Sequence, residues 1–209
     1  MKKKLFLLSC ALFFTYSAQA QVNVIEAPAN YQFIDMGFDA VNGEVAMVGQ
    51  IVEGNNEIPT VFELNATGDG FTAQTLANLP GATGNASVLG ISSDAIRIAG
   101  SSSSSNSINN EGTTWLRATP NVVEGIGFIE GFTNNSTSTS AWSDGIVGNS
   151  SGLQLPIIWD ITNGIQILPG TDGGLAEAQG VSADGEISCL LYTSPSPRDQ
   201  RGSRMPSSA

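Results

Sequence analysis

The stretch Ala86–Gly100, ASVLGISSDAIRIAG, decides the expected fold because its pattern recurs along the chain. Small residues lead through an apolar-Ser-x-Asp turn into a short apolar strand that ends in glycine. Further copies are Thr139–Gly148 (TSAWSDGIVG), Ala178–Ile187 (AQGVSADGEI) and, more divergent, Ala40–Gly49 (AVNGEVAMVG). The closing glycines Gly49, Gly100 and Gly148 lie 51 and 48 residues apart. Self-similarity at such a period is typical of a stacked repeat architecture.

A second strand that centres on an aromatic residue follows three of these copies. The strands are Thr60–Leu64 with Phe62, Thr113–Leu116 with Trp115, and Pro156–Trp159 with Trp159. A third element follows, clearest at Gly164–Gly170 and echoed at Leu79–Gly81. Turn glycines and β-branched or aromatic strand residues favour hairpins. We predict that the aromatics form core between neighbouring repeats, rather than a ligand platform.

Each unit therefore reads as three or four short strands over about 45–50 residues, and no helical pattern follows residue 20. The period and the strand content predict an all-β repeat fold, a partial and truncated β-propeller of about three to four blades. Each blade is a small sheet that needs neighbours to cover its faces. A β-solenoid or a β-sandwich is the alternative.

Residues 1–20 follow the plan of a secretory signal peptide. Lys2–Lys4 are positive, Leu5–Phe14 are apolar, and Ala18-Gln19-Ala20 predict cleavage before Gln21. The alternative is a lipoprotein cleavage motif at Leu7–Cys10. No later segment is apolar for long enough to span a bilayer. We expect a secreted, extracellular or cell-surface bacterial protein without a membrane span.

The last 21 residues, Cys189–Ala209, differ in composition and hold three of the five arginines. Residues 189–199 resemble the conceptual translation of a transposase-type sequencing adapter, and residues 203–209 resemble its flow-cell end. The resemblance implies an artefactual, disordered tail after a repeat domain at 21–188, and a natural protein that continues beyond Ser188. The alternative is a genuine disordered tail rich in Ser, Pro and Arg.

Residues 21–188 contain no Lys, Cys or His. This composition excludes a Ser-His-Asp triad, an ordinary zinc site, a lysine Schiff base and a disulfide framework. The segment holds two arginines against 18 carboxylates, a formal charge of −16. Such a charge repels nucleic acid and anionic membranes, so we expect neither as a partner.

The segment Trp159–Gly185 is similar to the HAF-type extracellular repeat. The matching residues are Trp159, the Gly164–Gly170 stretch and Ala178-x-Gly180-Val181-Ser182-Ala183-Asp184-Gly185. The match is fair at Leu79–Gly100 and poor in the first unit, and the family's His-Ala-Phe triplet has no counterpart. The resemblance implies a propeller-like extracellular or cell-surface bacterial protein without established enzymatic activity. It supplies no catalytic residues.

Asp172, Glu177 and Asp184 cluster in a glycine-rich segment, and oxygen ligands on such turns can hold Ca²⁺. The alternative is that they are solvated turn carboxylates. We assign no catalytic or cofactor-binding residue. The sequence thus favours a non-catalytic binding or adhesion scaffold for an extracellular partner or glycan. The alternative is a carboxylate-dependent carbohydrate-active protein, with or without calcium.

Overall fold

The computed structural model describes residues 26–65, 67–107, 109–132, 134–150, 155–168 and 176–192. In these residues every regular element is a β-strand, so the predicted all-β class is confirmed. The described part of the chain accordingly has no helix that could cross a membrane. The predicted signal peptide and residues 193–209 lie outside the described residues.

The strands form four separate antiparallel sheets in chain order. Sheet 1 contains β1 (Tyr31–Asp39), β2 (Glu44–Glu53), β3 (Asn56–Leu64) and β4 (Phe71–Thr75). Sheet 2 contains β5 (Ser87–Ile91), β6 (Arg97–Ser102), β7 (Glu111–Leu116) and β8 (Val123–Gly125). Sheet 3 contains β9 (Ser136–Trp142), β10 (Gly145–Ser150), β11 (Leu155–Asp160) and β12 (Gly164–Ile167). Sheet 4 contains β13 (Ala176–Val181) and β14 (Ser188–Tyr192), and the predicted start of the tail at Cys189 falls inside β14.

The strand registers show that sheets 1 to 3 are copies of one unit. The closing glycine of each second strand pairs with the third strand, as Gly49↔Thr60, Gly100↔Thr113 and Gly148↔Ile157. Two residues further along the third strand stand the predicted aromatics, paired as Phe62↔Met47, Trp115↔Ile98 and Trp159↔Ile146. The glycines and aromatics that the sequence repeat singled out are therefore structurally equivalent.

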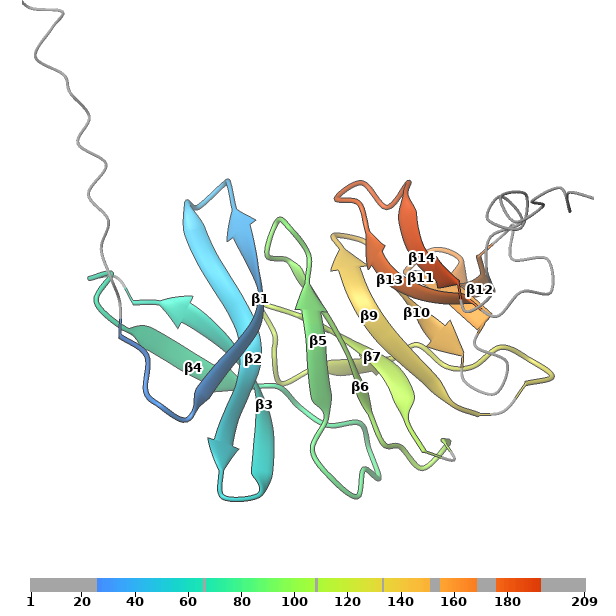
Figure 1. Ribbon diagram of the computed structural model, residues 1–209, viewed down its shortest axis with the longest axis horizontal. Helices are drawn as coiled ribbons and strands as arrows, with labels where there is room; N and C mark the ends of the chain where they lie inside the picture. Colours follow the sequence, from blue (N-terminus) through green and yellow to red (C-terminus); the bar gives the residue numbers. More distant parts are fainter. Residues whose placement is uncertain are drawn as a thin grey trace, which may run out of the picture.

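The first strand of every sheet carries a β-bulge at the same place. The register shifts between Phe33 and Asp35 in β1, Val88 and Gly90 in β5, Ser138 and Ser140 in β9, and Ala178 and Gly180 in β13. A bulge bends a strand and increases its local twist. Because the bulge recurs at the same place, the four first strands bend alike. These strands lie next to one another along the row of sheets (Figure 1).

The sheets pack face to face, and each interface has an apolar core. Between sheets 1 and 2 the core includes Val48, Val61, Val88, Ile98 and Trp115. Between sheets 2 and 3 it includes Ala99, Ala141, Ile146, Ile157 and Trp159. Between sheets 3 and 4 it includes Trp142, Val147 and Ala178. Sheets 2 and 3 thus each present one face to the sheet before them and the other to the sheet after them.

The prediction that aromatics fill the core between repeats is confirmed for Trp115 and Trp159. Trp115 is buried against sheet 1, and its indole Nε1 donates to the carbonyl of Ala77 at 2.8 Å. Phe62 differs, because it lies on the face of sheet 1 that no other described sheet covers. It is fully buried by aromatic rings of its own sheet, with Tyr31 at 4.9 Å and Phe33 at 5.0 Å between ring centroids.

The closing glycine is required by the close approach of the first strand. A Cβ at Gly100 would overlap the backbone carbonyl of Ser87 and the ring of Trp115. The same overlap arises at Gly49 with Gln32 and at Gly148 with Thr137. In β14 the equivalent position holds Leu190, which pairs with Ala178 as Gly100 pairs with Val88. The last sheet thus departs from the pattern here.

We expect Gly100→Ala to lower the free energy of unfolding by at least about 2 kcal/mol, because both obstructing groups belong to packed strands that cannot move aside cheaply. Urea unfolding followed by circular dichroism measures the effect. Gly84→Ala is the control, since a Cβ there meets nothing within 4 Å. Equal stability of the two variants would contradict the steric explanation.

Candidate functional site

The two arginines of residues 21–188 both lie in sheet 2 or directly after one of its strands, and each reaches a neighbouring sheet. Arg117 follows β7 and points to sheet 1, whereas Arg97 begins β6 and points to sheet 3. In this segment, which has 18 carboxylates, both cations therefore form contacts between sheets.

Arg117 binds three carboxylates of sheet 1. Its Nη2 lies 2.8 Å from Oδ2 of Asp39, and its Nη1 lies 3.0 Å from Oε2 of Glu44 and 3.1 Å from Oε1 of Glu63. Burial alone would lower the pKa of Arg117, but the hydrogen bond to Glu44 and the negative charges of Glu63, Glu44 and Asp39 outweigh it and raise the pKa above its usual value. The guanidinium therefore stays charged and joins the two sheets.

Asp39 is held in place by the turn between β1 and β2. Its Oδ1 accepts hydrogen bonds from the backbone N–H groups of Val41 (2.9 Å) and Asn42 (3.2 Å), and its Oδ2 accepts one from Asn42 Nδ2 (2.8 Å). These bonds, the Asn42 side chain first, and the charge of Arg117 lower the pKa of Asp39. The turn closes at Gly43, whose φ of +71° favours glycine.

The same turn recurs between β11 and β12 as Asp160-x-x-Asn163-Gly164. Oδ1 of Asp160 accepts from the N–H groups of Thr162 (2.8 Å) and Asn163 (2.7 Å), and Asn163 Nδ2 donates to Oδ2 at 2.9 Å. Gly164 has a φ of +67°, close to that of Gly43. This Asp-x-x-Asn-Gly motif is visible in the sequence but does not follow the repeat period, because its two copies connect different strand pairs.

Arg97 is 5% exposed and bonds to neutral groups. Its Nε donates to the carbonyl of Ser143 at 3.0 Å, and its Nη1 donates to Oγ1 of Thr114 at 3.2 Å. The guanidinium carbon lies 5.5 Å from the centre of the Trp159 ring, within the range of a cation–π interaction. Burial lowers the pKa of Arg97, and the charges of Glu124 and Asp144 oppose that effect. Arg97 thus joins sheet 2 to sheet 3.

Of the three predicted calcium ligands, the structure describes Glu177 and Asp184. Asp172 lies outside the described residues. Glu177 lies on β13, where its Oε2 accepts from Gln179 Nε2 at 3.1 Å. Oδ1 of Asp184 accepts from Ser182 Oγ (2.5 Å) and from the N–H of Glu186 (3.1 Å), bonds that lower its pKa. In the described ranges no three acidic, His or Cys side chains gather in a way that could hold a metal ion.

Asp184 has a structural equivalent, Asp94, in sheet 2. Ser92 and Asp94 make the corresponding turn between β5 and β6, with the Ser92 hydroxyl donating to Asp94 Oδ1 at 2.5 Å. In each turn a backbone N–H five residues after the serine donates back to the serine Oγ, at 2.9 Å in both cases. The Ser-x-Asp motif of the sequence repeat is therefore a turn-forming device in the two sheets that carry it.

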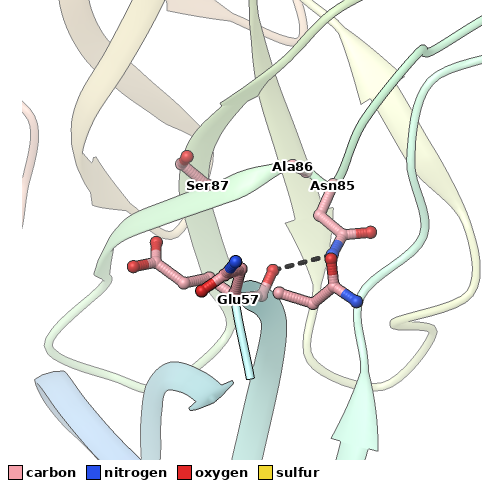
Figure 2. A pocket seen from close by; sticks show the side chains of 6 residues that line it. Glu57, Asn85, Ala86 and Ser87 are labelled. Atoms are coloured by element: carbon pink, nitrogen blue, oxygen red, sulfur yellow. Dashed lines mark hydrogen bonds between the residues drawn. The ribbon is translucent and has the colours of Figure 1, made fainter. Parts of the chain in front are cut away.

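A polar hollow of about 220 Å³ opens between sheets 1 and 2 (Figure 2). It lies between the β2–β3 turn and the start of β5, and its lining residues are Asn55, Asn56, Glu57, Asn85, Ala86 and Ser87. Asn85 Nδ2 donates to the backbone carbonyl of Glu57 at 2.9 Å, which ties the two walls together. The lining offers amides, a hydroxyl and one carboxylate, with neither a cation nor an aromatic ring.

This hollow could not be predicted from the sequence, because its walls come from two segments about 30 residues apart that meet only when the sheets stack. The sole signal in the sequence is the run Asn55-Asn56 beside Gly54, which reads as a turn. A hollow of about 420 Å³ near Gly43 and Asn65 contains Glu44 and Glu63, whose carboxylates are already paired with Arg117.

Comparison with known proteins gives no matching family model and no matching curated relative. The geometry of the chain itself therefore carries the interpretation.

We expect Arg117→Gln to lower the free energy of unfolding by about 2 kcal/mol at low salt, between the values for exposed and buried ion pairs. The variant leaves the carboxylates of Asp39, Glu44 and Glu63 facing one another without a cation. Urea unfolding at low and at high salt measures the effect, and salt should shrink it. The comparison variant is Arg97→Gln, whose loss should change little with salt because Arg97 bonds to neutral groups. Identical salt dependence of the two variants would contradict these assignments.

The turn aspartates predict a pH dependence. Since the folded pKa of Asp39 is lowered, its stabilising effect is complete above the unfolded pKa of about 3.9 and is lost as the pH falls through the folded value. Asn42→Ala removes the largest cause of the lowering. We expect the variant to melt below the wild type near neutral pH, and the gap to close in acid. Thermal melting over a pH series tests this, with Asn163→Ala at the equivalent turn expected to behave alike. A gap that is independent of pH would refute it.

Proposed function

We propose that this chain is a secreted or cell-surface repeat protein that acts as a non-catalytic binding or adhesion scaffold. The support for the scaffold is the repeated unit, in which three sheets share one register and pack face to face in chain order. We further propose that the sheets are blades of a propeller-like array. Their sequential antiparallel order and their adjacent first strands favour that arrangement.

The residue chemistry supports a role without catalysis. Residues 21–188 lack the side chains on which most nucleophilic, imidazole-based and zinc-based mechanisms depend. Three carboxylates of sheet 1, those of Asp39, Glu44 and Glu63, share the cation of Arg117. Paired in this way, they serve the contact between sheets and are poorly suited to the acid–base work of a glycosidase.

The hollow between sheets 1 and 2 is the proposed binding site, and a neutral, hydroxyl-rich glycan is the proposed class of ligand. Side-chain amides both donate and accept hydrogen bonds, as sugar hydroxyls do. An anionic ligand would meet Glu57 and the acidic surface of the chain, without a compensating cation in the lining. The observation that carries the proposal is this amide-rich lining between sheets 1 and 2.

The test is binding of the protein to an array of neutral and anionic glycans. We expect saturable binding of a neutral glycan, weakened at least about tenfold in Asn56→Ala, a loss that corresponds to one or two hydrogen bonds. Glu53→Ala is the matched control, because Glu53 is exposed on the same hairpin but does not line the hollow. Binding that Asn56→Ala leaves unchanged would refute the site. Release of shortened sugar products would refute the non-catalytic role in favour of a carbohydrate-active protein.

A further inference from the structure

The outward face of sheet 1, the face that carries Phe62, is exposed where the equivalent faces of the other sheets are buried. Phe33 is 40% exposed, whereas its register equivalents Val88, Ser138 and Ala178 are between 0% and 2% exposed. Met36 is 66% exposed, whereas its equivalents Ile91 and Ala141 are each 5% exposed. In sheets 2 to 4 the preceding sheet covers these positions. The outward face of sheet 1 is therefore an interface of the repeat without its covering sheet.

This face is apolar, and aromatic rings pack against one another on it. The Phe33 ring packs edge-on against the Phe62 ring, and its centroid lies 5.3 Å from that of the Phe71 ring. The three rings form the base of this face. Phe38, which is 51% exposed, extends the apolar surface along β1. Along β2 the outward positions are Val45, Met47, Gly49 and Ile51. A contiguous apolar surface of this kind marks an interaction site.

The other end of the row exposes the complementary face. Ile187 is equivalent to Arg97, because its carbonyl accepts from the N–H of Ser182 as that of Arg97 accepts from Ser92. Arg97 points to the following sheet, so Ile187 points to the side on which a following sheet would pack. Ile187 is 71% exposed, and Leu191 on the same face of β14 is 54% exposed. Both ends of the row thus show apolar faces that match the two sides of the repeat interface.

We propose that copies of this chain associate head to tail, with sheet 4 of one copy packed on the outward face of sheet 1 of the next. The contact continues the packing already present between sheets 1 and 2, 2 and 3, and 3 and 4. It is heterologous, because two different surfaces meet, and it can extend to further copies. From residue 21 onward the chain has five arginines and 19 carboxylates, a formal charge of −14, which opposes association at low salt. Association therefore strengthens as salt screens the repulsion.

The experiment is sedimentation velocity of the protein from residue 21 onward, over a concentration series at moderate and high salt. A reductant is present throughout, since Cys189 is exposed and could cross-link copies. Met36→Lys places a charge on the outward face of sheet 1, and Ile187→Lys places one on that of sheet 4. Val122→Lys is the control, with the same change of charge at a 59% exposed loop residue on neither face. Circular dichroism of each variant checks that it is folded.

We expect the wild type and Val122→Lys to associate with rising concentration, and Met36→Lys and Ile187→Lys to remain monomeric. An equimolar mixture of the last two should form a dimer and nothing larger, because each supplies the face that the other has lost. The proposal is overturned if the wild type is monomeric throughout, or if Ile187→Lys still associates, which would mean that two copies of sheet 1 pair with each other. It is also overturned if the mixture stays monomeric.

Discussion

A small antiparallel sheet that is apolar on both faces has to be covered on both, and the rest of this structure depends on that constraint. Sheet 2 satisfies it completely, with Trp115 buried against sheet 1 and Ala99 buried against sheet 3. Burial of apolar surface of this kind is the main stabilising contribution to a fold. Each of the three apolar cores is formed by two neighbouring sheets. The stability of the array therefore depends mainly on the contacts between sheets.

The polar contacts reinforce the same interfaces. Arg97 lies in sheet 2 and Arg117 directly follows its strand β7, and the two side chains reach opposite neighbouring sheets. Their environments differ: Arg117 sits among carboxylates at a partly open edge, whereas Arg97 lies buried beside Trp159 and neutral acceptors. Buried guanidinium groups need such partners, since a desolvated charge without them is costly. In residues 21–188, which are strongly acidic, both arginines thus stabilise contacts between sheets.

Much of the fold could be predicted from the sequence because the repeat encodes local geometry. The closing glycines mark a close backbone approach, and the aromatics two positions along the facing strand mark the core, so both recur at fixed places. The bulge in each first strand could not be predicted, since Ile34, Leu89, Thr139 and Gln179 share no side-chain type. Trp142 and the polar hollow escaped prediction for another reason, because both acquire their roles only when separate sheets meet.

The setting of Phe62 follows from the same logic. In sheets 2 and 3 the aromatic of the third strand is buried by the sheet before it, but for Phe62 that neighbour is missing from the described residues. Sheet 1 instead covers Phe62 with its own rings, Tyr31 and Phe33, and Phe71 packs against Phe33. Phe33 is larger than the valine and the serine that the first strands of sheets 2 and 3 place opposite the closing glycine. The larger side chain of Phe33 thus buries Phe62 but is itself partly exposed at the surface. The apolar surface that lacks a covering sheet is now the one formed by these rings. This face of the molecule therefore still resembles one side of an interface.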